Sequence, residues 1–101
     1  MNVTFRQLQA FSAVGTCGSF TRAAEQLHIT QSAISVLVRE LEAVLGVRLF
    51  DRTTRKVELT ATGCDFLPQA RHLVLDAQRT LERLRDKTRA GQGHFTLACV
   101  P

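Results

Sequence analysis

The sequence predicts a mostly helical fold in which three short helices, a small β-hairpin and one long helix follow one another. Three observations support this prediction. Apolar residues recur at helical spacing through the first half, a basic segment between two apolar pairs interrupts them, and a heptad-like pattern fills much of the second half. With 101 residues, 45% of them hydrophobic, the chain has the size and composition of one globular domain with a modest core.

The first helix is expected to begin after Thr4, because Thr4 and Gln7 have the spacing of a capping box. Two glycines within residues 15–18 then end it after about three turns. Between these signals, the apolar residues that recur in steps of three predict one inward stripe, made of Phe5, Leu8, Phe11 and Val14.

A second, short helix follows, and either Ser19 or Thr21 can cap it. Residues 28–30 form a tight corner, after which Thr30 caps a third helix that runs to about Leu45, where Gly46 stops it. The short helix contributes apolar residues to the core, namely Phe20, Ala23, Ala24 and Leu27.

The third helix has two distinct faces when each residue is turned by about 100°. Its apolar face consists of Ile34, Leu37, Val38, Leu41 and Leu45, and its polar edge carries Gln31, Ser32, Ser35 and Arg39. A solvated helix face more often carries Lys and Glu, whereas short neutral hydrogen-bonding groups can enter a groove and reach base edges or phosphates. A short helix, a three-residue corner and this third helix therefore predict a nucleic-acid contact at the polar edge.

Residues 47–60 predict a small β-hairpin with a basic tip. Leu49 and Phe50 precede the tip, and Val57 and Leu59 follow it. From position 48 to position 56 there are four positive residues and one negative residue, so most of the formal net charge of +4 lies in nine positions. A basic turn of this kind is usually only solvated, but its charge would suit contact with phosphates if the hairpin lies at a nucleic-acid interface.

The long helix is expected to begin after Thr60 or Thr62, but Pro68 cannot donate to the carbonyl four residues back. We therefore expect a short turn over 61–67 and a main helix that begins at Pro68. Its apolar positions step by three and four through nearly three heptads and form a seam, which consists of Leu67, Ala70, Val74, Ala77, Leu81 and Leu84. Part of the seam can pack back on the chain's own first helices. Such a helix would nevertheless be about 40 Å long, too long for those helices to cover, so the seam predicts a partner helix.

Residues 91–93 read as a flexible joint, and residues 94–100 alternate like a β-strand that has no partner in this chain. The three cysteines, Cys17, Cys64 and Cys99, form no C-x-x-C pair, the three histidines are scattered, and no phosphate-binding or nucleophile motif occurs. We therefore expect no catalytic residues, no metal and no cofactor. No apolar run has the length of a membrane span and no secretion signal is present, which predicts a cytoplasmic protein without a membrane partner.

Several motifs, in order and with matching spacing, carry a resemblance to a known family. They are Leu8-Gln9-Ala10-Phe11, Gly18-Ser19-Phe20-Thr21-Arg22-Ala23-Ala24, Leu27 with Thr30-Gln31-Ser32-Ala33-Ile34-Ser35, Leu41-Glu42 with Leu45-Gly46-Val47-Arg48-Leu49-Phe50-Asp51-Arg52, and Leu59-Thr60 with Gly63. Residues 5–90 resemble the amino-terminal DNA-binding region of LysR-type transcriptional regulators of bacteria. The resemblance implies a winged helix-turn-helix over residues 1–59, a linker and dimerisation helix over 60–90, and a hinge with the first strand of an effector-binding domain over 91–101.

The resemblance also implies the partners and the roles of individual residues. The partners are double-stranded DNA and a second copy of the chain, or a tetramer in a longer protein, with no small-molecule ligand in this region. Residues that match the family's major-groove readers are Gln31, Ser32 and Ser35, which follow Thr30. Arg55 matches a wing residue that enters the minor groove. The resemblance also implies that sugar and phosphate are contacted by Arg52, Thr53, Thr54 and Lys56.

One departure concerns the residues directly after Ser35, where many relatives carry Arg and then Gln. This chain has Val36 and Leu37, so it lacks the usual bidentate reader of guanine, and Val36 is suited to a thymine methyl instead. Arg39 has two interpretations, DNA contact or pairing with Glu42 one turn away. A rival interpretation of the whole chain is a dimerisation adaptor whose basic hairpin binds acidic protein, or a non-specific DNA binder.

Overall fold

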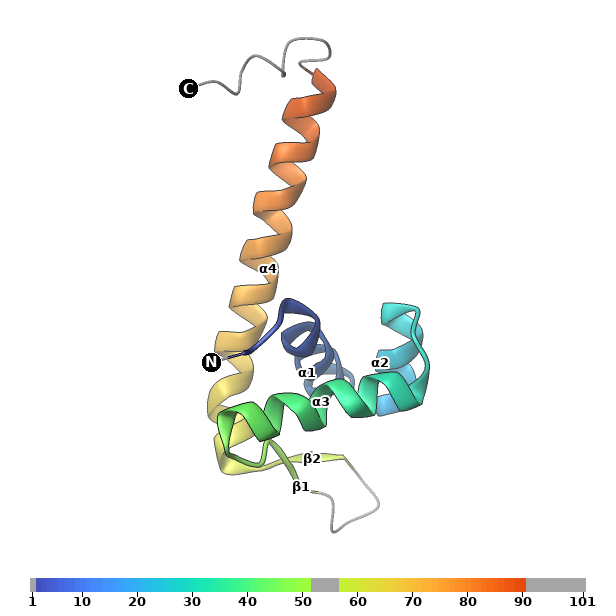
Figure 1. The fold of residues 1–101 in the computed structure, drawn as a ribbon, viewed down its shortest axis with the longest axis vertical. Helices are drawn as coiled ribbons and strands as arrows, with labels where there is room; N and C mark the ends of the chain where they lie inside the picture. Colours follow the sequence, from blue (N-terminus) through green and yellow to red (C-terminus); the bar gives the residue numbers. More distant parts are fainter. Residues whose placement is uncertain (1, 52–56, 91–101) are drawn as a thin grey trace.

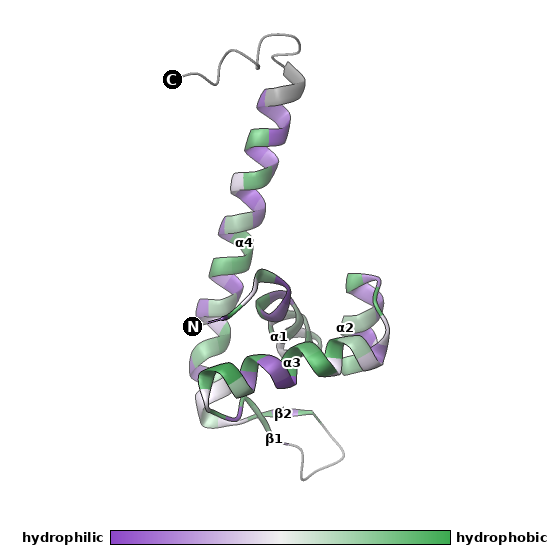
Figure 2. Cartoon of the chain, in the orientation of Figure 1, coloured by the Kyte–Doolittle hydropathy of each residue, from purple (hydrophilic) through white to green (hydrophobic). Residues whose placement is uncertain are grey.

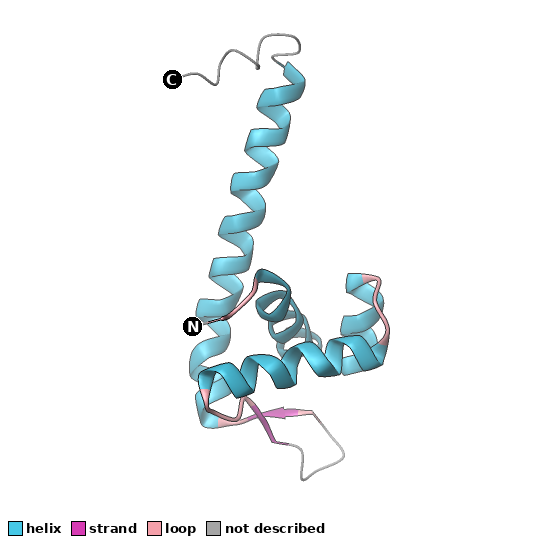
Figure 3. Cartoon of the chain, in the orientation of Figure 1, coloured by secondary structure: helices cyan, strands magenta, loops and turns pink. Residues whose placement is uncertain are grey.

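The computed structural model describes residues 2–51 and 57–90 (Figure 1). In chain order it contains α1 (Phe5–Cys17), α2 (Phe20–Leu27), α3 (Gln31–Leu45), β1 (Phe50–Asp51), β2 (Glu58–Leu59) and α4 (Ala61–Ala90), as Figure 3 shows. Three helices, a two-stranded antiparallel sheet and one long helix confirm the predicted winged helix-turn-helix with its linker helix. The joint and the strand expected over 91–100 lie outside the described residues.

The start of α1 is fixed by the predicted capping box. The Thr4 side chain accepts a hydrogen bond from the Gln7 backbone N–H at 3.2 Å, and the Gln7 side chain accepts one from the Thr4 N–H at 3.1 Å. The predicted inward stripe is wrong at Phe5, which is 37% exposed, because three steps of three residues turn the stripe by about 180° between Phe5 and Val14. The residues that α1 buries are Gln7, Ala10, Phe11 and Val14.

The caps of α2 and α3 define the corner between them. The Ser19 side chain accepts from the Arg22 N–H at 3.2 Å, so Ser19 and not Thr21 caps α2. His28 ends α2 in the left-handed conformation with φ of 59°, and the Thr30 side chain accepts from the Ala33 N–H at 3.0 Å. The corner and its cap are therefore those expected from the sequence.

The core surrounds α1, which packs against α2, α3 and α4. The Phe11 ring lies 5.4 Å from the rings of both Phe50 and Phe66, measured between centroids. Phe50 belongs to β1 and Phe66 to α4, so the hairpin and the beginning of the long helix share one core with the helix-turn-helix. The largest fully buried side chains also include Ile34, Leu41, Leu49, Val14 and Val38.

The long helix α4 is continuous through Pro68, and the predicted break at this residue is wrong. Thr60 lies just before the helix and its side chain accepts from the Gly63 N–H at 3.0 Å, which settles the open choice in favour of Thr60. Cys64 and Pro68 are both exposed, so the Cys64 carbonyl that loses its helical partner lies on the water side. Packing of the buried Ala70 against the core helps to hold the helix in line beyond the proline.

The distal half of α4 stands clear of the other elements (Figure 1). Ala70 and Val74 are buried within the chain and Leu67 packs against its core, whereas Leu81 is 59% and Leu84 is 61% exposed. Figure 2 shows apolar bands alternating with polar ones along this free part of the helix. The first half of the predicted seam is therefore used inside this chain, and the second half is open to solvent.

Candidate nucleic-acid interface

The polar edge of α3 lies on the surface and forms one continuous feature. Five residues from the first two and a half turns of the helix line a single shallow, open depression: Gln31, Ser32, Ser35, Val36 and Arg39. Ser35 is half-buried and the other four are exposed. The structure thus brings together all the α3 residues that the sequence singled out, and it keeps their side chains out of the protein interior.

The opposite face of α3 explains why this edge points outward. Ile34, Val38 and Leu41 are fully buried in the common core, which fixes the rotation of the helix about its axis. Ala23 and Ala24 in α2 are also buried, and their small side chains allow α2 to approach the core closely. Because both helices are held in this way, the polar edge at the beginning of α3 faces outward, directly after the corner.

The depression has a charge pattern that favours an anion. Arg39 is the charged residue among its five lining residues, and the first turn of α3 contains no acidic residue. The N-terminus of a helix carries a partial positive charge, which attracts negative groups. Val36, which is 48% exposed, places an apolar surface beside the polar groups, so the edge offers both hydrogen bonds and a contact for a methyl group.

The base of the hairpin is anchored beside the core. Phe50 pairs with Leu59 and Asp51 with Glu58 in antiparallel register. The predicted wing-tip residues lie outside the described residues: Arg52, Thr53, Thr54, Arg55 and Lys56.

Glu42 has a role that was not recognised in the sequence, where it counted only as part of the family motif Leu41-Glu42 and as a partner for Arg39. Its carboxylate accepts hydrogen bonds from the backbone N–H groups of Leu49 at 2.8 Å and of Phe50 at 3.2 Å. Gly46, with φ of 71°, turns the chain back so that these amides reach the helix they have just left. A carboxylate placed four residues before the helix-ending glycine was the only local signal for this contact.

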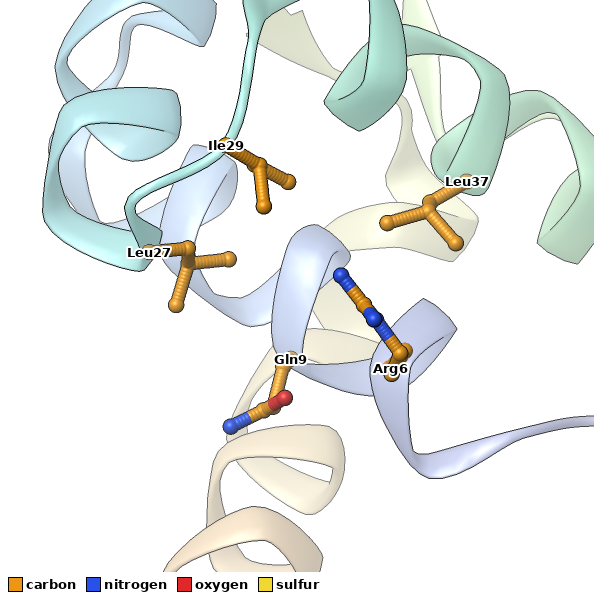
Figure 4. Close-up of a pocket in the computed structure, with 5 residues that line it drawn as sticks. All are labelled: Arg6, Gln9, Leu27, Ile29 and Leu37. Carbon is orange, nitrogen blue, oxygen red and sulfur yellow. The ribbon is translucent and has the colours of Figure 1, made fainter.

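A second depression lies where α1 meets the corner and α3 (Figure 4). Figure 4 shows the side chains that line it, which come from α1, the end of α2, the corner and α3: Arg6, Gln9, Leu27, Ile29 and Leu37. Its lining has one cation and no carboxylate, thiol or hydroxyl, so it offers no acid, base or nucleophile for catalysis. Across residues 2–51 and 57–90, no group of three or more histidine, cysteine or acidic side chains is placed to hold a metal ion. Nor does any helix there have the length and hydropathy needed to span a bilayer.

A helix-turn-helix whose second helix presents an exposed edge of this kind defines the class of DNA-binding transcription regulators. Residues 5–64 match the family described as bacterial regulatory helix-turn-helix protein, lysR family. The chain belongs to this family.

Individual relatives agree with this assignment. The uncharacterized HTH-type transcriptional regulator YbhD of Escherichia coli is 43% identical over 94 residues, which cover 93% of this chain and 30% of that protein. A mutant OxyR of Corynebacterium glutamicum superimposes with a TM-score of 0.80 at 35% identity, over 85% of this chain and 28% of that one. The chain in the BenM_DBD/catB site 1 DNA complex superimposes with a TM-score of 0.76 at 33% identity, over 90% of this chain and 99% of that one. The chain spans 30% of the length of YbhD and 31% of the length of the HTH-type transcriptional regulator CfxR of Cupriavidus necator.

Proposed function

We propose that the chain is the sequence-specific DNA-binding part of a dimeric transcription regulator, with α3 in the major groove and the basic hairpin at the minor groove. The observation that carries this proposal is the single outward depression formed by the predicted α3 residues. The BenM chain that matches nearly end to end was solved with DNA, which supports the same partner here. The proposal includes no catalytic residue, metal or small-molecule ligand, and it places the protein with the chromosome in the cytoplasm.

Within the groove, each residue type suits a different group of the duplex. The Gln31 amide can donate and accept at once, as an adenine edge requires, and the hydroxyls of Ser32 and Ser35 can contact either bases or phosphates. Val36 packs on a thymine methyl. Thr30 and Arg39, at either end of the edge, contact the phosphate backbone and so fix the register of the helix.

In the same proposal, Arg55 enters the minor groove. The flanking phosphates are contacted by the other wing residues, Arg52, Thr53, Thr54 and Lys56. We expect Arg55→Ala to weaken binding to every duplex and to reduce the slope of log affinity against log salt by about 0.9, the value of one phosphate contact. Fluorescence anisotropy at a series of salt concentrations measures both quantities. An unchanged slope would contradict a wing that contacts DNA.

The second half of α4 is proposed as the dimer interface. Of the six seam residues, Ala70 and Val74 are already buried and Leu67 packs on the chain's own core, which leaves Ala77, Leu81 and Leu84. Leu73, which the seam omitted, is 51% exposed and extends this surface. Pairing along it would place two α3 helices about one DNA turn apart, near 34 to 36 Å or a multiple of it, and implies a dyad-like operator.

We expect Leu81→Glu to convert the dimer into a monomer, because a carboxylate in the seam would have to be buried without a partner. Sedimentation velocity should show at least about a 100-fold rise in the dimer dissociation constant, close to 3 kcal/mol. Leu75→Glu is the matched control, since Leu75 is 45% exposed but lies about 120° around the helix from Leu81. Equal behaviour of the two variants, or a wild-type chain that is monomeric, would contradict this interface.

The proposed function is tested by titrating the chain with the DNA directly upstream of its own coding region and with a scrambled duplex, each at two salt concentrations. We expect the upstream DNA to bind at least about 100-fold more tightly, and we expect both affinities to fall with salt. Equal and weak binding to both duplexes would reject sequence-specific recognition in favour of a non-specific binder, and no binding would favour the adaptor.

A further inference from the structure

The helices α3 and α4 must keep a fixed angle to each other if α4 is to position α3 on DNA. Both helices pack against α1, but they share little direct contact with each other. The short segment of residues 48–50, which leads into β1, lies between the end of α3 and the beginning of α4 and is hydrogen-bonded to both.

On the α3 side, the link is the Glu42 carboxylate. One of its oxygens accepts from the N–H groups of Leu49 and Phe50, at 2.8 and 3.2 Å. A hydrogen bond to an ionised acceptor is stronger and more directional than one between neutral groups. The end of α3 is thus tied to the backbone that follows it.

On the α4 side, the link is Thr60. Its hydroxyl donates to the Arg48 carbonyl at 2.6 Å and accepts from the Gly63 N–H at 3.0 Å, so one group serves both segment 48–50 and the first turn of α4. The Thr60 N–H also donates to the Leu49 carbonyl at 3.0 Å. Gly63 lets the helix approach the same carbonyl so closely that an added Cβ would collide with it.

We propose that Glu42 and Thr60 form a clamp on residues 48–50 that sets the angle between α3 and α4, and thereby the spacing of the two DNA half-sites that a dimer reads. The spacing part of this inference rests on the proposed function. The clamp lies at the fixed end of a helix of 30 residues, which is about 45 Å long. A tilt of roughly 10° at the clamp would displace the far end by about 8 Å, enough to change how two copies sit on DNA.

The first arm of the test measures helix orientation without DNA, from residual dipolar couplings of backbone amides in the full chain. In the wild type, couplings from α3 and α4 should fit one alignment tensor. Thr60→Val keeps the side-chain shape but removes the hydroxyl, and we expect its two helices to need separate tensors, while Thr60→Ser restores the single fit. Glu42→Leu and its conservative counterpart Glu42→Gln form a second pair, which decides the question if Thr60→Val does not fold.

The second arm measures binding to duplexes that carry two half-sites at varied spacing, and to a single half-site. We expect the wild type to prefer one spacing by about tenfold or more. Thr60→Val should lose this preference to within about threefold while its single-site affinity stays within about twofold of wild type. Wild-type behaviour of both Thr60→Val and Glu42→Leu in the first arm would overturn the clamp. If the variants need separate tensors but keep the wild-type spacing preference, the role of the clamp in DNA binding is overturned. If the wild type binds no duplex, the proposed function is rejected, and the first arm still decides whether the clamp sets the angle between α3 and α4.

Discussion

Replacing Ser32 by glutamate is expected to lower affinity for the specific duplex by about 100-fold or more, without loss of stability. Ser32 is exposed and lines the α3 depression. In the proposed complex, a carboxylate at this position would face the phosphates and base edges of the major groove. Like charges brought together in this way cost several kcal/mol. Fluorescence anisotropy with the upstream duplex measures the loss.

The stability of the same variant separates a binding effect from a folding effect. The first turn of α3 has no acidic residue, and a carboxylate near a helix N-terminus stabilises the helix by about 0.3 to 1 kcal/mol. The melting temperature should therefore stay unchanged or rise. Thr16→Glu is the control, because it makes the same change in charge at an exposed residue in the last turn of α1. An equal loss of affinity in both variants would mean that net charge alone is responsible and that α3 does not enter the groove.

Gly63→Ala is expected to destabilise the chain by about 2 to 3 kcal/mol, although it adds a single methyl group to a helix. Gly63 is buried in the first turn of α4, and its added Cβ would meet the Leu49 backbone oxygen and lie 3.0 Å from a Leu59 side-chain carbon. The Leu49 oxygen cannot yield easily, because it accepts the Thr60 N–H and belongs to the segment that Glu42 also holds. Thermal unfolding followed by circular dichroism should show a decrease in Tm of about 10 to 20 °C.

Gly15→Ala provides the matched comparison within α1. An added Cβ there would lie 2.7 Å from a terminal carbon of Leu67, which is the end of a flexible side chain and can move aside. Alanine also favours the helix over glycine by about 1 kcal/mol, which offsets the crowding. We expect the free energy of unfolding to stay within about 1 kcal/mol of the wild type. If both glycine variants melted at the same temperature, the close approach at Gly63 would have no energetic importance.

The features that the sequence predicted correctly depend on neighbours within one helical turn. Thr4 and Thr30 accept from amides three residues away, so their roles follow from local spacing alone. The outward edge of α3 follows from helix rotation together with the apolar residues that must lie opposite it. Family resemblance added the winged helix-turn-helix arrangement and the DNA partner, which local spacing alone does not specify.

The features that were mistaken or missed depend on where separate elements meet. Pro68 was expected to break α4, but the outcome depended on which side of the helix faced the core. The sequence left open how much of the seam packs within the chain, because that depends on how far α1 extends along α4. Glu42 and Thr60 contact backbone groups seven to twelve residues away, across turns whose geometry is set only in the folded chain.

The stacking of Phe66 on Phe11 bears on where the independently folding unit ends. A boundary at residue 59 would separate sequence motifs but would cut through a shared interior, because Phe66, Leu67 and Ala70 cover one side of α1. A fragment ending there would expose part of Phe11 to water and remove one of its two aromatic neighbours, Phe66. We therefore expect the smallest autonomous unit to include the part of α4 through Val74, the last residue of this helix that is buried in the described part of the chain. The helix-turn-helix and this first part of α4 should then unfold in one cooperative transition.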